Sequence, residues 1–347
     1  MKKIILTIDY ELFLGKQTGS VYDTIIKPAD NLLNILEKNN SKMTVFWDVL
    51  HYYALNKNII NNPELKEDIS LIKNQIINFV KKGHDVQMHI HPHWLDAVYK
   101  NGIWKFNYDK FDIHSLDNYS EKEGSISIND CISLAKQIME NLILPIKPDY
   151  KVSAYRAGGY LIQPFQDLKS VFIEKGIYID SSVCPNMAYN NGVFSYNFLN
   201  YPNGILYKFK DTPKIPDNTG VFIEIPVKTI VINPLINIYF KILRRIKYPN
   251  IENKRTGTGA STFSKSKNII IKKFILLFIS KTEQLTTDSS FNEKFNYILS
   301  KSEDFSTMIL HPKLLNNHTL SLLKNKILTD KIKFVSIKDF MDNKINI

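Results

Sequence analysis

The sequence predicts an α/β fold in which parallel strands are joined by helical crossovers, arranged as an open sheet or a barrel. Three observations support this prediction. Short apolar runs alternate with amphipathic segments from one end of the chain to the other. Charged or polar side chains follow several of these runs directly. Apolar residues make up 44% of the 347 residues, which is enough for a sizeable core.

The expected elements alternate in chain order. Runs rich in β-branched and aromatic residues predict strands at 2–9, 41–50, 85–91, 151–159, 177–183, 221–230 and 306–312. Apolar positions at helical spacing predict helices at 25–40, 64–82, 128–144, 161–176, 290–300 and 320–330. Gly83 is placed to end the second of these helices, and residues 332–343 close the chain.

The positive charge is concentrated in one region. The formal net charge is +11, and residues 228–283 carry 12 Lys/Arg against 2 Asp/Glu, a local net of +10. We interpret residues 1–347 as a single domain with a basic insertion at about 228–283. Its segment NPLINIYFKILRRIKY predicts an amphipathic helix that would make a peripheral contact with an anionic membrane. A solvated insertion is the alternative. No nucleic-acid motif accompanies the charge, so no nucleic-acid partner is expected.

The amino-terminal region favours a cytoplasmic protein. The apolar run Ile4–Ile8 is too short for a secretory signal, and Asp9 and Glu11 follow it at once. No apolar stretch reaches the roughly 18 residues that a membrane span needs. The two cysteines suggest a reducing compartment without a disulfide framework. We therefore expect a cytoplasmic location, at most peripheral to the inner face of the membrane.

Half of the eight histidines lie in GHDVQMHIHPH, at positions 84, 89, 91 and 93. Imidazole nitrogens and carboxylate oxygens are the usual ligands of catalytic zinc. The segment DYE at 9–11 places two carboxylates after another predicted strand. Because a barrel brings the carboxyl ends of its strands to one face, these groups predict a site for a divalent metal ion.

Five motifs in order resemble the polysaccharide deacetylase family, the NodB-homology carbohydrate esterases of the family 4 type. They are LTIDYE, TVFWDV, GHDVQMHIHPH, YRAGGY and MILHP, between residues 5 and 314. The resemblance covers nearly the whole chain except the basic insertion. It implies a distorted (β/α) barrel of the seven-stranded, NodB-like type, and a metal-dependent enzyme.

The resemblance also implies roles for the residues that match. Asp9 would be the general base and His311 the general acid. Arg156 would orient and tune Asp9, the backbone N–H of Gly159 would help to hold the oxyanion, and Asp180 would tune a catalytic partner. The implied metal ligands are Glu11, His89 and His93. The implied cofactor is one divalent ion, Zn²⁺, with Co²⁺, Ni²⁺ or Fe²⁺ as alternatives.

The chain departs from the family pattern at three places. Tyr10 separates Asp9 from Glu11, so the roles of base and ligand are open to exchange. RAGGY stands where many members have R-P-P-Y-G, which leaves the oxyanion donor less fixed. His91 is an additional candidate ligand, because residues 89, 91 and 93 share one face of an extended strand. Pro92 disfavours a regular strand there, and the choice of 89 and 93 follows the family.

The resemblance, together with these residues, implies a hydrolase that removes an acetyl group from an N-acetylated sugar of a polysaccharide or glycan precursor. A place in surface polysaccharide biosynthesis is the matching expectation. Two alternatives stay open. One is another carbon–nitrogen hydrolase, acting on a non-peptide amide. The other is an inactive homologue that keeps the fold and binds sugar.

Overall fold

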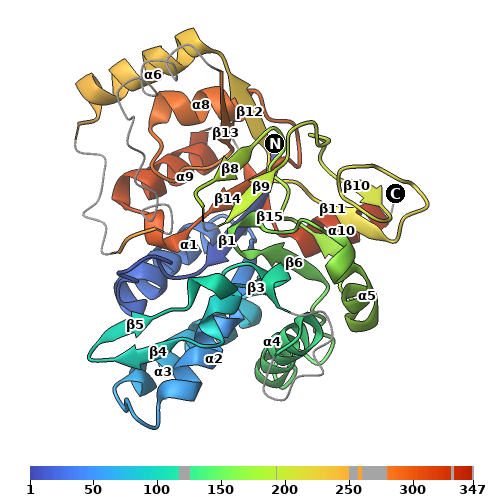
Figure 1. Cartoon of the computed structure of the whole chain (residues 1–347). Coiled ribbons are helices and arrows are strands. Elements are labelled where there is room, and N and C mark those ends of the chain that lie inside the picture. The colour runs from blue at the N-terminus through green and yellow to red at the C-terminus, as the bar shows by residue number, and fades with distance from the viewer. Residues whose placement is uncertain (117–125, 193, 250–256, 260–279, 330–331, 346–347) are drawn as a thin grey trace.

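The computed structural model describes the chain except for residues 117–125, 193, 250–256, 260–279, 330–331 and 346–347. A parallel sheet occupies the centre of the molecule, and helices surround it (Figure 1). Much of the sheet is fully buried. In the first strand, every residue from Ile4 to Tyr10 is buried, as the apolar run predicts.

Seven strands form the centre, and each predicted strand range contains most or all of one of them. Their order across the sheet is β14-β1-β2-β3-β6-β7-β11, and each neighbouring pair is parallel. The antiparallel β10 (Tyr207–Phe209) extends one edge, and β15 (Lys333–Val335) pairs with the start of β1. The seven strands are β1 (Lys3–Tyr10), β2 (Thr44–Asp48), β3 (Asp85–Ile90), β6 (Ala154–Ala157), β7 (Ile179–Asp180), β11 (Phe222–Glu224) and β14 (Thr307–Leu310).

The sheet curls until the chain after β11 meets β14. Val227 forms a parallel bridge with Thr307, and the N–H of Lys228 donates to the carbonyl oxygen of Thr307 at 2.9 Å. The N–H of Val227 also donates to the carbonyl oxygen of Val183 at 2.9 Å. The segment after β11 therefore connects β14 with the chain that follows β7. The predicted fold class, a distorted α/β barrel, is confirmed.

Helices cover the outside of the barrel. They are α1 (Lys27–Glu37), α2 (Val49–Asn58), α3 (Leu65–Lys81), α4 (Ile128–Ile143), α5 (Gln166–Lys175), α6 (Pro234–Lys247), α8 (Asn292–Ser300), α9 (Asn317–Thr329) and α10 (Ile337–Ile345). Gly83, with φ of 77°, follows the end of α3 as predicted. Ser127 and Asp130 form a reciprocal capping box at the start of α4.

Three antiparallel strand pairs were not predicted, the first two of which are hairpins. They are β4 (Val98–Lys100) with β5 (Ile103–Lys105), β8 (Ala188–Asn190) with β9 (Ser195–Asn197), and β12 (Thr229–Ile232) with β13 (Lys281–Gln284). The expected strand 221–230 is in fact two strands, β11 and β12, because the chain leaves the barrel after Val227. Short helical segments also occur: the π-helix Tyr22–Ile26, which runs directly into α1, and the 3-10 turns Pro92–Trp94, Tyr108–Lys110, Ile113–Ser115, Gly158–Tyr160 and Pro312–Leu314.

The predicted basic insertion is described only in part. Residues 250–256 and 260–279 lie outside the described residues, so the extent of the insertion stays a prediction. Helix α6 occupies the segment in which an amphipathic helix was expected, along the upper edge of Figure 1. Within the described part of the chain, every helix is too short or too polar to cross a bilayer.

Candidate active site

The carboxyl ends of the parallel strands bring the predicted polar residues together. Asp9 and Glu11 lie at the end of β1, His89 and the following His91 at the end of β3, and Arg156 on β6. His311 follows β14, the strand that pairs with β1 on its other side. All of these side chains except that of His311 are at most 6% exposed, so their charges interact with little screening by water.

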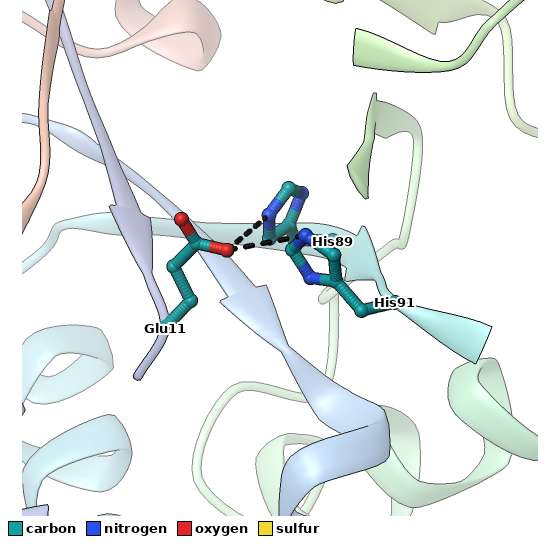
Figure 2. Close-up of side chains that lie close together, drawn as sticks. All are labelled: Glu11, His89 and His91. Carbon is teal, nitrogen blue, oxygen red and sulfur yellow. Dashed lines mark hydrogen bonds and ion pairs between the residues drawn. The ribbon is translucent and has the colours of Figure 1, made fainter. Parts of the chain in front are cut away.

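Glu11, His89 and His91 form a compact cluster, which Figure 2 shows. Oε2 of Glu11 lies 3.4 Å from Nε2 of His89 and 3.2 Å from Nε2 of His91. One donor atom from each residue lies within 4.8 Å of the others. Two imidazole nitrogens and a carboxylate oxygen make a donor set that suits a divalent transition-metal ion. The residues therefore fit the metal that the sequence predicts.

Further contacts hold the two imidazoles in position. Nδ1 of His89 donates to the carbonyl oxygen of Arg156 at 2.8 Å, which directs Nε2 toward Glu11. Nδ1 of His91 lies 3.3 Å from Oδ2 of Asp48, a carboxylate at the end of β2. Burial lowers the pKa of His89, but its hydrogen bond with Glu11 and the charge of Asp9 raise that pKa to about 9. The cluster thus attracts positive charge.

His93, a predicted ligand, lies outside this cluster. The chain turns at Pro92 into one turn of 3-10 helix, which directs His93 away from His89 and His91. Its ring stacks on Phe111 with centroids 5.2 Å apart, and neither ring nitrogen has a hydrogen-bond partner among the described residues. Burial, reinforced by the charge of His91, lowers the pKa of His93 to about 3. In place of His93, the structure groups His91 with Glu11 and His89.

Asp9 and Arg156 form a buried ion pair. Nη1 of Arg156 donates to Oδ1 of Asp9 at 2.7 Å. The guanidinium also donates to Oγ1 of Thr7 and to the carbonyl and hydroxyl oxygens of Ser181, so its position is fixed. Burial raises the pKa of Asp9, but Arg156 and then His89 offset this effect and lower it below its usual value. The contact expected between Arg156 and Asp9 is present.

His311 faces the same two carboxylates. Its Nε2 lies 3.6 Å from Oδ2 of Asp9 and 3.9 Å from Oε1 of Glu11. Its Nδ1 lies 2.7 Å from Oδ2 of Asp288, which also accepts the backbone N–H of His311 at 3.0 Å. Burial lowers the pKa of His311, but the hydrogen bond and charge of Asp288 outweigh burial and raise it. The site therefore favours the protonated form of this imidazole.

Asp288 and Lys313 are site residues that the sequence analysis missed. Nζ of Lys313 donates to Oε1 of Glu11 at 2.6 Å and to the carbonyl oxygen of Leu12 at 3.0 Å. This contact occupies Oε1 and leaves Oε2 of Glu11 facing the imidazoles. Asp288 lies in a loop with no strand pattern before it, whereas Lys313, two residues after His311, was within reach of a strand-end argument.

Asp180 lies buried at the end of β7. It pairs in register with Glu224 across β7 and β11, and Oδ1 of Asp180 accepts the hydroxyl of Ser182 at 2.6 Å. Ser182 in turn accepts the N–H of Ala157, the residue that follows Arg156. Asp180 therefore supports the strand ends that carry Arg156. The predicted role of Asp180, tuning a catalytic partner, stays a prediction, and the carboxylate that contacts His311 is Asp288.

The buried carboxyl pair gives a stability prediction. Burial, and then their mutual charge, raises the pKa of Glu224 well above its ordinary value, and burial also raises the pKa of Asp180. The folded state thus holds a proton that the unfolded chain releases from about pH 4.5 upward. Stability should fall as pH rises through this window, by at most about 1.4 kcal/mol per pH unit for one proton.

Glu224→Gln should remove this dependence, because the amide keeps a donor toward Asp180 without titrating. We expect a smaller drop in the free energy of unfolding between pH 5 and pH 8 than in wild type. Urea denaturation of metal-free protein measures it. Glu174→Gln, whose side chain is 57% exposed, is the matched control and should follow wild type. Parallel wild-type and Glu224→Gln curves would show that the pair does not share a proton.

Gly158 and Gly159 shape the wall beside the cluster. A Cβ on Gly158 would lie 2.3 Å from the carbonyl oxygen of Ile90 and 2.6 Å from the ring of His91, so only glycine leaves room for that imidazole. Gly159 has φ of 61° and lies against Phe111 and Phe194. Gly159 lines the cavity, and the donor role of its N–H stays a prediction.

A cavity of about 280 Å³ opens on these groups. Its charged and polar floor consists of Asp9, Glu11, His89, His91 and His311. Its walls are mostly aromatic and apolar: Leu14, Phe111, Ala157, Gly159, Tyr160, Tyr189, Phe194 and Tyr196. Three larger hollows, of about 390, 620 and 780 Å³, are lined by none of the floor residues. The small cavity is therefore the candidate active site.

Comparison with known proteins gives structural likeness only. No family model and no curated protein sequence matches the chain. Among solved structures, a protein described as a polysaccharide deacetylase from Mycobacterium smegmatis matches with 13% identity and a TM-score of 0.46, covering 98% of this chain and 89% of that one. The Puue allantoinase matches with 11% identity and a TM-score of 0.44, over 97% and 88% of the two chains.

Two further structures represent the family 4 carbohydrate esterases. The enzyme from Streptomyces lividans in complex with acetate matches with 11% identity, a TM-score of 0.37 and coverage of 96% and 91%. A mutant of BA3943, a pseudoenzyme of that family, matches with 11% identity, a TM-score of 0.40 and coverage of 97% and 66%. Likeness at this level carries no argument about activity, which rests on the side chains.

Proposed function

We propose that the protein is a metal-dependent hydrolase that removes the acetyl group from an N-acetylated sugar. The observation that carries the proposal is that one cluster of three side chains and two paired groups meet at one cavity. These are the Glu11–His89–His91 cluster, the Asp9–Arg156 ion pair and the His311–Asp288 pair. Each supplies one part that amide hydrolysis needs: a site for a Lewis acid, a base and an acid.

We assign Glu11, His89 and His91 as the residues that hold the metal, in place of the set with His93. Zn²⁺ is the ion we expect, since two imidazoles and one carboxylate are a common catalytic zinc set. A divalent ion there supplies polarisation of the amide carbonyl and acidification of water. Lys313 fixes the carboxylate of Glu11, because it bonds Oε1 and leaves Oε2 to His89 and His91.

The chain's own residues then move the protons. Asp9, kept ionised by Arg156, accepts a proton from the attacking water. Gly159 lines the cavity, and its N–H would donate to the developing oxyanion. His311, whose protonated form Asp288 stabilises, donates a proton from Nε2 to the leaving nitrogen. Acetate and a free amine are the products, and the atoms of one water are divided between them.

Acetate release tests the function. Protein loaded with Zn²⁺ or Co²⁺ is incubated with the gluco, galacto and manno forms of N-acetylhexosamine, free and as glycosides, and acetate is measured enzymatically. We expect release that a chelator abolishes and added metal restores. Release from none of these sugars, together with turnover of cyclic amides, would favour another carbon–nitrogen hydrolase. Binding of sugar without any turnover would favour an inactive homologue.

We also propose that α6 docks on an anionic lipid surface, where a carrier-linked glycan precursor for a surface polysaccharide would be found. Four apolar side chains form one exposed stripe on this helix, at spacings of four, three and four residues: Leu235, Tyr239, Ile242 and Ile246, each more than half exposed. Exposed Lys241 and Arg245 flank the stripe. This combination suits the interface of the cytoplasm-facing leaflet, which carries the anionic lipids.

Vesicle binding tests the docking proposal. The Leu235→Gln/Ile246→Gln double variant should bind phosphatidylcholine vesicles that contain phosphatidylserine about tenfold or more weakly than wild type. The reason is that two apolar side chains that would be buried in the lipid are lost. Co-sedimentation measures it. Ile60→Gln/Ile215→Gln, which changes two exposed isoleucines outside α6, is the control and should bind as wild type does. Equal binding by the two double variants would reject the docking face.

A further inference from the structure

The β8–β9 hairpin presents an aromatic surface toward the active site. Tyr189 and Tyr196 are directly opposite each other in the hairpin register, with ring centroids 6.0 Å apart. Phe194 precedes β9 and lies 5.4 Å from the ring of Tyr189. All three side chains line the cavity that holds the candidate metal cluster. The hairpin is therefore a part of the site that the proposed chemistry does not use.

Contacts at both ends hold the hairpin over the barrel. At its tip, Phe194 stacks on Phe111 with centroids 4.9 Å apart, and Phe111 comes from the loop after β5 on the other side of the site. At its base, the amide of Gln163 bonds both backbone groups of Asn197, at 2.9 and 3.0 Å. Tyr196 also contacts Tyr160 in the turn after β6, at 5.7 Å. The hairpin and Phe111 thus meet across the strand ends.

This arrangement limits the size of the cavity. Its volume of about 280 Å³ lies just below the roughly 300–1,000 Å³ usual for ligand pockets. An internal unit of a polymer needs room for a neighbour on each side, whereas a terminal unit needs room on one side only. The aromatic walls offer flat apolar faces for the C–H faces of one sugar ring.

We propose that the β8–β9 hairpin, closed onto Phe111, restricts the site to one terminal N-acylated sugar unit. The group to which this unit is linked, whatever its size, stays outside the cavity. The proposal rests on the proposed function and narrows its substrate class from polysaccharide to a single sugar unit at an end. Phe194 and Tyr189 are positioning residues here, because they bound the ring without touching the reacting amide.

Binding and cleavage are measured separately to test this restriction. Isothermal titration uses metal-loaded protein in an Asp9→Asn background, so that the ligand is not consumed. The probes are the methyl glycosides of N-acetylglucosamine, N-acetylgalactosamine and N-acetylmannosamine, and the hexamer of N-acetylglucosamine. We expect at least one glycoside to bind, and Phe194→Ala to weaken that binding about tenfold through loss of one stacking face. Leu199→Ala, which removes a 48% exposed side chain next to the hairpin, should leave binding unchanged.

The position of deacetylation in the hexamer supplies the second measurement, read by mass spectrometry of the products. Wild type should act on a terminal unit or not at all, whereas Phe194→Ala should gain internal products relative to terminal ones. Internal products from wild type, or no binding of any glycoside, would overturn the restriction. Glycoside binding without acetate release from any probe would keep the restriction and reject the proposed function.

Discussion

His91→Ala is expected to remove the metal from the protein, whereas His93→Phe is expected to keep it. His91 brings its Nε2 to within 3.2 Å of Glu11, and its loss leaves two of three ligands. We expect affinity to fall by more than about 100-fold, the upper effect seen when a supporting partner of a ligand is lost. Metal content by mass spectrometry, on protein purified without added metal, should fall from about one equivalent to near zero.

The second variant separates the two candidate histidines. Phe in place of His93 keeps the ring that stacks on Phe111 and removes two buried nitrogens that lack partners. Its stability should therefore equal or exceed that of wild type. Circular dichroism and thermal melting control for folding in both variants. Metal lost from His93→Phe but retained by His91→Ala would restore the ligand set that the family resemblance implies.

Asp9→Asn is expected to lower acetate release by about 10²- to 10⁴-fold, the usual contribution of a general base, while metal content stays at the wild-type level. The asparagine keeps the shape of the side chain and an oxygen for Arg156, but it accepts no proton from water. Initial rates on the best N-acetylated sugar measure the effect, with metal content determined on the same samples.

Asp85→Asn is the matched control for this variant. Asp85 is also a buried carboxylate, but it lies at the start of β3, at the end of the barrel opposite the active site. Its variant should lose stability and keep activity once folded. Metal loss in Asp9→Asn with metal retention in Glu11→Gln would show that the two carboxylates exchange roles, an alternative that the sequence left open.

Position along the chain explains which parts of the site the sequence could predict. Asp9, His89, Arg156 and His311 each end or follow a strand with a clear apolar pattern, and parallel strands bring their ends to one face. The choice between His91 and His93 depended on where β3 stops. The strand geometry persists through His91, whose φ and ψ are −119° and 100°, and the turn begins only at Pro92.

Other features had no local signal. Asp288 reaches His311 from an irregular loop, and only the folded chain brings them together. Helix α2 buries Val49, Leu50, His51, Ala54 and Leu55, which lie on more than one face, so no stripe of helical periodicity marks it. The strands of the β8–β9 hairpin have three residues each, too few for alternation to stand out. Its aromatic residues gave no sign of the site they enclose.

The bare Cα of Gly158 sets a rule for how chains with this site can diverge. Any side chain at that position would enter the space of the His91 ring and the carbonyl of Ile90. Position 158 and the H-x-H pair on the neighbouring strand must therefore vary together over evolutionary time. A related sequence with a larger residue at 158 would have to draw its third ligand from elsewhere. Glycine after the Arg-Ala dipeptide, read with H-x-H, is thus a marker for recognising this site in other sequences.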